Sequence, residues 1–183
     1  MSLEGLLLAA GAGSRMGMPK ALVHDDGRSW LAAGVRTLRR GGCDRVTVVL
    51  GAAADEAVRL LDGLGVDVVI APDWADGMSA SLCAGLRALP GDGDAAVVLL
   101  VDLPDVTAAV VRRVVDAGAG PTALRRATFE GRPGHPVLIG RDHWAGVLAG
   151  TSGDEGARSY LAAHEVDLVD CGDLATGHDV DAR

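Results

Sequence analysis

Short apolar runs alternate with helix-type patterns along the whole chain. The runs are typical of buried strands, and between them apolar residues recur three or four positions apart, as on helices packed by one face. Strands are predicted at 6–10, 46–50, 66–71, 95–101, 122–127, 136–139 and 166–171, and helices at 30–40, 54–64, 79–89, 107–117 and 154–164. This alternation predicts an α/β protein with a mixed, mainly parallel sheet and helices on both faces.

Several features of the pattern are specific enough to check. The run 95–101 is the most apolar and is expected to be a central strand, with ligands at the carboxyl edge of the sheet. Ser29 is expected to cap the helix that follows it. The helix at 54–64 is expected to bury Val58, Leu61 and Leu64, and a Gly-rich turn at 130–134 should join two strands.

Composition narrows the class of protein. A chain of 183 residues corresponds to one domain, here 1–183, and a net charge of −8 with five aromatic residues disfavours a nucleic-acid partner. Three cysteines without a C-x-x-C pair predict neither a disulfide framework nor a zinc site, and fit reduced thiols in a cytoplasm. The apolar runs are too short for a signal peptide or a membrane span. We therefore expect a cytoplasmic protein with no membrane partner; oligomeric state is not readable from the sequence.

The segment after the first predicted strand is rich in groups that bind anions. It contains Gly11, Gly13 and Gly17, and glycines let backbone N–H groups approach an anion because no Cβ intervenes. Arg15 and Lys20 add two cations, and Lys20 is the only lysine beside sixteen arginines. The simpler interpretation is an ordinary Gly-rich turn with solvated cations.

Two common nucleotide-binding patterns fit this segment poorly. A Walker loop needs Gly-Lys followed by Ser or Thr, whereas Lys20 lies between Pro19 and Ala21. The dinucleotide pattern G-x-G-x-x-G lacks its third glycine, and Gly51 and Ala52 follow the second predicted strand where an acidic residue would be expected.

A third pattern matches closely. The run Leu8-Ala9-Ala10-Gly11-Ala12-Gly13-Ser14-Arg15-Met16-Gly17-Met18-Pro19-Lys20 resembles the signature of the MobA-like nucleotidyltransferases. Later segments resemble further motifs of that family in the right order, over residues 5 to 181. They are Gly77-Met78-Ser79-Ala80-Ser81-Leu82, Asp102-Leu103-Pro104, Gly134-His135-Pro136, Gly153-Asp154-Glu155-Gly156-Ala157-Arg158 and Asp179-Val180-Asp181. Ala10 and Pro19-Lys20 look like the molybdenum cofactor cytidylyltransferase branch.

The resemblance implies a fold, a reaction and a site. The fold would be a single three-layer α/β/α, Rossmann-like domain of the nucleotide-diphospho-sugar transferase type. The reaction would transfer a nucleotidyl group to the molybdopterin form of the molybdenum cofactor and release pyrophosphate. The resemblance favours CMP from CTP over GMP from GTP. The implied catalytic residues are Arg15, Lys20 and Asp102, and Asp102 and Asp181 would hold Mg²⁺.

The remaining implied site residues divide between nucleotide and acceptor. Nucleotide-binding residues would be Leu8, Ala9, Ala10, Gly11, Ala12, Gly13, Ser14, Arg15, Lys20, Gly77, Ser79 and Ser81. Acceptor-binding residues would be His135, Asp154 and Arg158. The chain departs from the family pattern at its last motif, where Ala182-Arg183 follow Asp181 in place of Thr-Pro-Glu-Asp.

The chemistry also stands without the resemblance. Attack on the α-phosphorus of a nucleoside triphosphate requires neutralised phosphate charge, and carboxylates from different strand ends suit Mg²⁺. Each residue also has a structural interpretation. Asp102 could be a turn residue before Pro104, Ser79 and Ser81 could cap a helix, and Asp179 and Asp181 could belong to a solvated tail.

Other interpretations stay open at this point. His135 could be merely exposed, and the pairs Arg112-Arg113 and Arg125-Arg126 could be solvated. We also expect the positive charge of Arg15 to lower the pKa of Lys20 in the empty site. Competing functions are transfer to a sugar or polyol phosphate, a catalytically weak nucleotide-binding regulatory module, and an NAD-dependent oxidoreductase, which the failed dinucleotide pattern disfavours.

Overall fold

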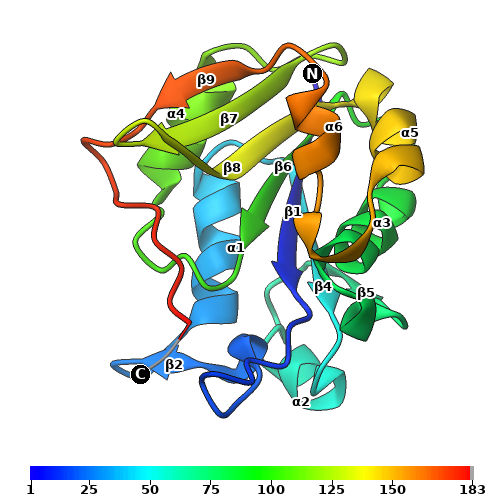
Figure 1. The fold of residues 1–183 in the computed structure, drawn as a ribbon. Helices are drawn as coiled ribbons and strands as arrows, with labels where there is room; N and C mark the ends of the chain where they lie inside the picture. The colour runs from blue at the N-terminus through cyan, green and yellow to red at the C-terminus, as the bar shows by residue number, and fades with distance from the viewer. Residues whose placement is uncertain (182–183) are drawn as a thin grey trace.

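A seven-stranded sheet forms the centre of the computed structural model, which describes residues 1–181 (Figure 1). Its strand order is β5-β4-β1-β6-β8-β7-β9, which places β6 in the middle as expected from its apolar run. The strands are β1 (Leu3–Ala9), β4 (Arg45–Leu50), β5 (Asp67–Ile70), β6 (Ala95–Leu100), β7 (Leu124–Phe129), β8 (Arg132–Gly140) and β9 (Asp167–Asp170). A small hairpin, β2 (His24–Asp25) and β3 (Arg28–Ser29), forms a separate sheet.

The sheet is mixed and mainly parallel, as predicted. β1, β4, β5 and β6 pair in parallel, whereas β8 is antiparallel to both of its neighbours, β6 and β7, and β9 is parallel to β7. The carboxyl ends of β1, β4 and β6 therefore meet at one edge. This is the edge at which open α/β sheets bind ligands.

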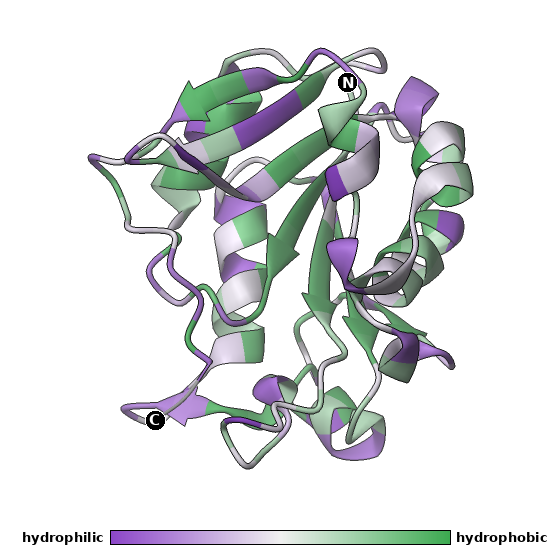
Figure 2. Cartoon of the chain, in the orientation of Figure 1, coloured by the Kyte–Doolittle hydropathy of each residue, from purple (hydrophilic) through white to green (hydrophobic). Residues whose placement is uncertain are grey.

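Helices cover both faces of the sheet. The helices are α1 (Trp30–Arg40), α2 (Ala54–Arg59), α3 (Met78–Ala88), α4 (Ala108–Asp116), α5 (Arg141–Gly150) and α6 (Arg158–Ala162), with 3₁₀ turns η1 (Lys20–Leu22), η2 (Trp74–Asp76) and η3 (Gly153–Glu155). One core packs α1 and α4 against Leu7 of β1, and a second packs α3, α5 and α6 against Leu6 and Leu8. Successive strand residues point to opposite faces, so one apolar strand supplies both cores. β1 and β6 are largely green in Figure 2 for this reason.

Two predicted helices are shorter than expected. α2 ends at Arg59, and Val58 is 37% exposed rather than buried. Leu61 is buried and Leu64 partly buried beyond the helix, where Gly63 and Gly65 have positive φ. The predicted helix at 154–164 is divided, because Gly156 has φ +56 between η3 and α6.

Three local predictions on capping and turns had different outcomes. The Ser29 side chain accepts a hydrogen bond from the Ala32 amide and caps α1, as expected. Ser79 does not cap α3, because Gly77 precedes the first residue of that helix. The turn predicted at 130–134 is shorter, because β8 begins at Arg132 and includes Gly134.

No helix among residues 1–181 is long and apolar enough to cross a membrane. Cys43, Cys83 and Cys171 are all free and buried. Burial raises the pKa of the Cys43 thiol to about 12, so this thiol stays protonated at neutral pH.

Candidate functional site

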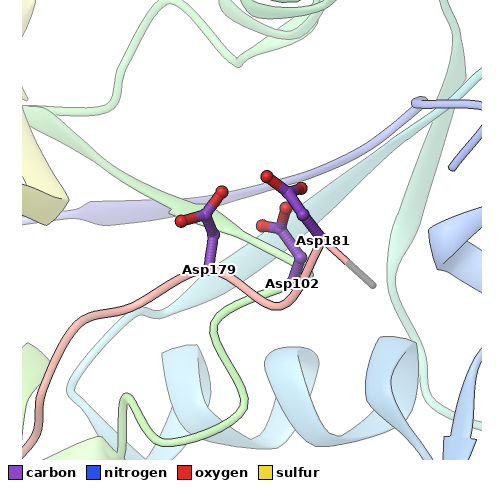
Figure 3. Close-up of side chains that lie close together, drawn as sticks. All are labelled: Asp102, Asp179 and Asp181. Atoms are coloured by element: carbon purple, nitrogen blue, oxygen red, sulfur yellow. The ribbon is translucent and has the colours of Figure 1, made fainter. Parts of the chain in front are cut away.

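Three carboxylates meet at the carboxyl end of the central strand (Figure 3). Asp102 follows β6, whereas Asp179 and Asp181 come from the segment after β9, and one ligand oxygen from each lies within 4.8 Å of the others. Residues 171–181, red in Figure 1, run from β9 toward the end of the molecule at which β1 points. Carboxylate oxygens in such a group suit a hard divalent cation.

Backbone contacts hold the C-terminal segment at the sheet. The Val180 amide donates to the Asp102 carbonyl at 3.0 Å, between the two acidic residues of the segment. The amide and the hydroxyl of Thr176 donate to Asp105 Oδ2 at 2.7 and 2.6 Å. These contacts position Asp179 and Asp181. Residues 182–183, which depart from the family pattern, lie outside the described residues.

Lys20 occupies the position between two of the carboxylates. Its Nζ donates to Asp102 Oδ2 and, at 2.6 Å, to Asp181 Oδ1. Burial alone would lower the pKa of Lys20, but hydrogen bonds and the charges of both carboxylates outweigh it, and the net pKa is raised. The expectation that Arg15 lowers this pKa was wrong, because Arg15 pairs with Asp181 at 3.3 Å and the two carboxylates dominate the environment of Lys20.

The carboxylates of the C-terminal segment differ in their affinity for protons. Hydrogen bonds from Lys20 and Asp179 hold the pKa of Asp181 below its ordinary value. Burial raises the pKa of Asp179, and the neighbouring Asp181 and Asp102 raise it further. The cluster already holds one ammonium group between two of its carboxylates, so its donor set fits a cation.

The Gly-rich loop lines a cavity of about 460 Å³ on one side of the cluster. A Cβ on Gly11 would meet no atom within 4 Å, so the backbone at Gly11 is open to a ligand. Gly13 has φ +60, and a Cβ there would overlap the Met18 carbonyl oxygen. Gly11 therefore leaves the backbone accessible to a ligand, and Gly13 permits the turn.

Most residues expected to bind the nucleotide line this cavity. They are Leu8, Ala9, Ala10, Gly11, Ala12, Gly13, Ser14, Arg15, Lys20, Gly77 and Ser81, joined by Asp102 and Asp181. Ser79 is not among the described lining residues, because it is buried with its hydroxyl 3.5 Å from the Gly156 carbonyl. Trp74 and Met78 also line the cavity. Sequence reasoning did not assign them, although Met78 lies within the motif that begins at Gly77 and Trp74 lies three residues before it.

A second cavity, of about 390 Å³, also adjoins the cluster. The three residues expected to bind the acceptor, His135, Asp154 and Arg158, all line it. Lys20, Asp102, Asp154 and Asp181 line both cavities, so one ammonium group and three carboxylates lie where the two cavities meet. Volumes of this size are those of small-molecule sites.

The acceptor-side cavity also contains an arginine that sequence reasoning placed in solvent. Arg126 is partly buried in the cavity wall, and burial lowers its pKa, with a further lowering from Arg158. Arg125 is also largely covered, and its guanidinium pairs with Asp167 at 3.1 Å. The interpretation that Arg125 and Arg126 are solvated was therefore wrong for both residues. The alternation of strand β7 and the neighbouring strands explain the burial.

An open α/β sheet with a Gly-rich loop, a partly buried lysine and a carboxylate cluster at its carboxyl edge is the arrangement in which Rossmann-like proteins bind nucleotides. The model of the MobA-like NTP transferase domain matches residues 5–168, and the chain belongs to this nucleotidyltransferase family. The fold is that of the nucleotide-diphospho-sugar transferases, as the resemblance implied.

The chain is similar to a curated protein and to solved structures over nearly its whole length. The chain is 36% identical to the nicotine blue oxidoreductase of Paenarthrobacter nicotinovorans over 98% of this chain and 92% of the relative. It is similar to the crystal structure of Rv0371c from Mycobacterium tuberculosis H37Rv, with a TM-score of 0.84, 30% identity, and coverage of 100% and 93% of the two chains. A complex of Rv0371c with manganese has a TM-score of 0.80, 28% identity, and coverage of 98% and 94%.

Proposed function

We propose that this protein transfers CMP from CTP, in the presence of Mg²⁺, to the molybdopterin form of the molybdenum cofactor and releases pyrophosphate. The observation that carries the proposal is the position of Lys20, Asp102 and Asp181, which line both the loop-side and the acceptor-side cavity. Two substrates that bind one in each cavity would meet at this cluster.

The loop side of the site supplies groups that suit a triphosphate. Open backbone at Gly11 would receive phosphate oxygens, and Arg15 and Lys20 would offset their charge. In the reaction a phosphate oxygen of the acceptor forms a bond to the α-phosphorus, and the bond from the α-phosphorus to the bridging oxygen breaks, so that pyrophosphate leaves. Lys20 would be released from its carboxylates toward the phosphates.

The carboxylate cluster would hold the metal. Asp102 and Asp181 are the proposed ligands, with Asp179 as a third oxygen donor within reach. A bound Mg²⁺ would neutralise phosphate charge at this point. Rv0371c, a protein of similar fold, has been solved as a complex with manganese, which supports the use of a divalent ion by this fold.

The choice of CTP rests on the resemblance at Ala10 and Pro19-Lys20. A site shaped for cytosine leaves polar groups unpaired when guanine enters, so the two bases should differ in kcat/KM. The acceptor is the less constrained substrate. Relatives over parts of the chain are named as an IPC transferase and DIPP synthase and as GlmU, and a sugar or polyol phosphate is the alternative acceptor.

An oxidoreductase is the second candidate function, and one observation favours it. The identity with the nicotine blue oxidoreductase extends over nearly the whole chain. The residues at the ends of β1 and β4 argue for nucleotidyl transfer instead, since the chain lacks the third glycine and the acidic residue of the dinucleotide pattern.

One set of assays separates these functions. Purified protein is incubated with Mg²⁺, each of the four nucleoside triphosphates and either molybdenum cofactor or a sugar phosphate, and pyrophosphate release is measured. Parallel reactions follow oxidation of NADH and NADPH with a redox dye supplied as the electron acceptor. Release with molybdenum cofactor, and a higher kcat/KM for CTP than for GTP, is the expected result. Nucleotide binding without release would indicate a regulatory module, and nicotinamide oxidation without release would indicate an oxidoreductase.

A further inference from the structure

The hairpin of β7 and β8 is irregular where it borders the acceptor-side cavity. Arg126 pairs with Val137 and Thr128 pairs with Pro133, so Ala127 alone opposes residues 134–136 of β8. Bulges of this kind redirect side chains and often lie beside functional sites. Here the displaced residues include His135, which lines the cavity.

The bulge also fixes the direction of Arg126. Its Nε donates to the Gly134 carbonyl at 3.0 Å, which anchors one edge of the guanidinium to the displaced segment. The preceding residue, Arg125, points to the other face of the sheet and pairs with Asp167. The two adjacent arginines therefore have different partners and different surroundings.

Arg126 and Arg158 line the same cavity, and neither forms an ion pair with any residue from 1 to 181. Five carboxylates also line this cavity. Asp102, Asp179 and Asp181 form the cluster at Lys20, and Glu155 accepts a hydrogen bond from Ser159. Asp154 lines the loop-side cavity as well and pairs with neither arginine. A partly buried guanidinium without a counter-ion is unfavourable, and a second positive charge nearby adds to the cost.

His135 contributes a neutral polar group to this end of the cavity. Burial, and to a smaller extent the charge of Arg126, lower its pKa to about 4, so the ring is uncharged at neutral pH. Apart from Lys20, which pairs with the carboxylate cluster, the positive charge of this cavity thus lies on the two guanidiniums. A guanidinium presents a fork of N–H donors that matches an oxyanion.

We infer that Arg126 and Arg158 form an anion-binding subsite, and that the acceptor carries a second negatively charged group in addition to the phosphate that attacks. The attacking phosphate would lie at Lys20 and the carboxylate cluster, and the second anionic group would lie at the two arginines. This assignment to the acceptor rests on the proposed function, whereas the subsite itself can be tested without any turnover.

The first test uses inorganic phosphate as the probe and chemical modification as the measurement. Phenylglyoxal modifies arginine, and peptide mapping identifies each modified residue. Phosphate should slow the modification of Arg126 and Arg158 several-fold, and the modification of Arg126 should lose this protection in Arg158→Gln. Arg125 should react at the same rate with and without phosphate. Protection of Arg15 alone, or of no arginine, would overturn the subsite.

The second test uses kinetics. Arg126→Gln and Arg158→Gln should each raise the KM for the acceptor about tenfold or more, the scale of a lost charge-assisted hydrogen bond, and leave the KM for CTP unchanged. Arg125→Gln is the matched control on the other face of β7. Because Arg158 is exposed, its replacement preserves the fold if Arg126→Gln does not.

The two tests distinguish failure of the subsite from failure of the proposed function. Phosphate protection of Arg126 and Arg158 in a protein that transfers no nucleotide would support the subsite and refute the proposed function. Normal transfer, with an unchanged acceptor KM in both variants and no protection by phosphate, would overturn the subsite and leave the proposed function standing.

Discussion

Lys20 and Asp181 are separated by 161 positions in the chain, yet Lys20 Nζ lies 2.6 Å from Asp181 Oδ1. The contact joins the loop after the first strand to the end of the C-terminal segment. The Lys20 side chain is only 17% exposed, so its charge is partly removed from water and depends on the carboxylates beside it. The lysine of the Gly-rich loop is thus part of the carboxylate cluster.

The raised pKa of Lys20 predicts slow acylation of its amine. Amine acylation requires the neutral form, and a pKa raised by Asp102 and Asp181 keeps the ammonium charged at pH 8. We expect a reagent to label the Met1 α-amine well before Lys20. Peptide mapping provides the measurement, since Lys20 is the only lysine in the sequence.

Replacement of Asp181 tests the cause of that protection. Asp181→Asn removes one of the two charges that raise the pKa of Lys20, so labelling of Lys20 should become several-fold faster. Asp173→Asn, which breaks a surface pair with Arg113, is the control and should not change it. In the wild-type protein, bound Mg-CTP should make labelling of Lys20 slower still. Rapid acylation of Lys20 with activity retained would show that the amine has no role in the site.

Sequence periodicity predicted most of the fold because the strands are continuous apolar runs. β6 is central, Ser29 caps α1, and the carboxyl ends of the parallel strands form the site edge. Conformations set by single glycines were missed, as at Gly156, which divides a predicted helix. A hydrophobic pattern does not reveal such a break, because the apolar spacing continues through it.

The candidate site was predicted in composition but not in its pairings. The loop glycines, Lys20, Asp102 and Asp181 were all identified from their motifs. Their mutual contacts depend on how the C-terminal segment returns to β6 through the Val180 amide, which is a long-range backbone contact. Arg126 was missed because an Arg-Arg pair in a strand gives no indication of which residue faces a cavity.

Asp102→Asn should abolish most activity while the protein stays folded. The change is nearly isosteric at a strand end, but it removes a charge from the proposed metal site. Turnover should fall about 10²-fold or more, as when one preorganised electrostatic group is lost. Asp92→Asn, on an exposed turn, serves as the control. Circular dichroism checks the fold, and near-normal turnover at saturating Mg²⁺ would contradict the metal assignment.

Gly11 and Gly13 form a matched pair that separates access from backbone strain. Gly13→Ala places a side chain at φ +60 against the Met18 carbonyl and should lower the free energy of unfolding by about 1–3 kcal/mol. Gly11→Ala places its methyl group in open space within the cavity and should leave stability nearly unchanged.

The effect on ligand binding should be the reverse of the effect on stability, with Gly11→Ala weakening CTP binding more than Gly13→Ala. The methyl group at Gly11 would stand where phosphate oxygens approach the backbone, so the Kd for CTP should rise about tenfold or more. Urea unfolding and calorimetric titration with Mg-CTP measure the two effects. A stable Gly13→Ala protein, or a Gly11→Ala protein with unchanged CTP affinity, would show that the loop does not work in this way.

His135 should make stability depend on pH between about 4 and 6.5. Its folded pKa is about 4, lowered by burial and then by Arg126, whereas an unperturbed histidine titrates near 6.5. In that window the unfolded chain binds a proton that the folded chain does not, so the contribution of His135 to stability is present above pH 6.5 and is lost as pH falls toward 4. The change should amount to about 1–3 kcal/mol. Urea unfolding of wild type and His135→Gln across this range should show a shallower dependence of stability on pH for the variant.

The contribution of Arg126 to the lowered pKa of His135 can be tested separately by NMR titration. Arg126→Gln should raise the pKa of His135, and Arg125→Gln, on the opposite face of β7, should not. A ring that titrates near 6.5 in the wild-type protein would contradict the burial of His135 in the acceptor-side cavity.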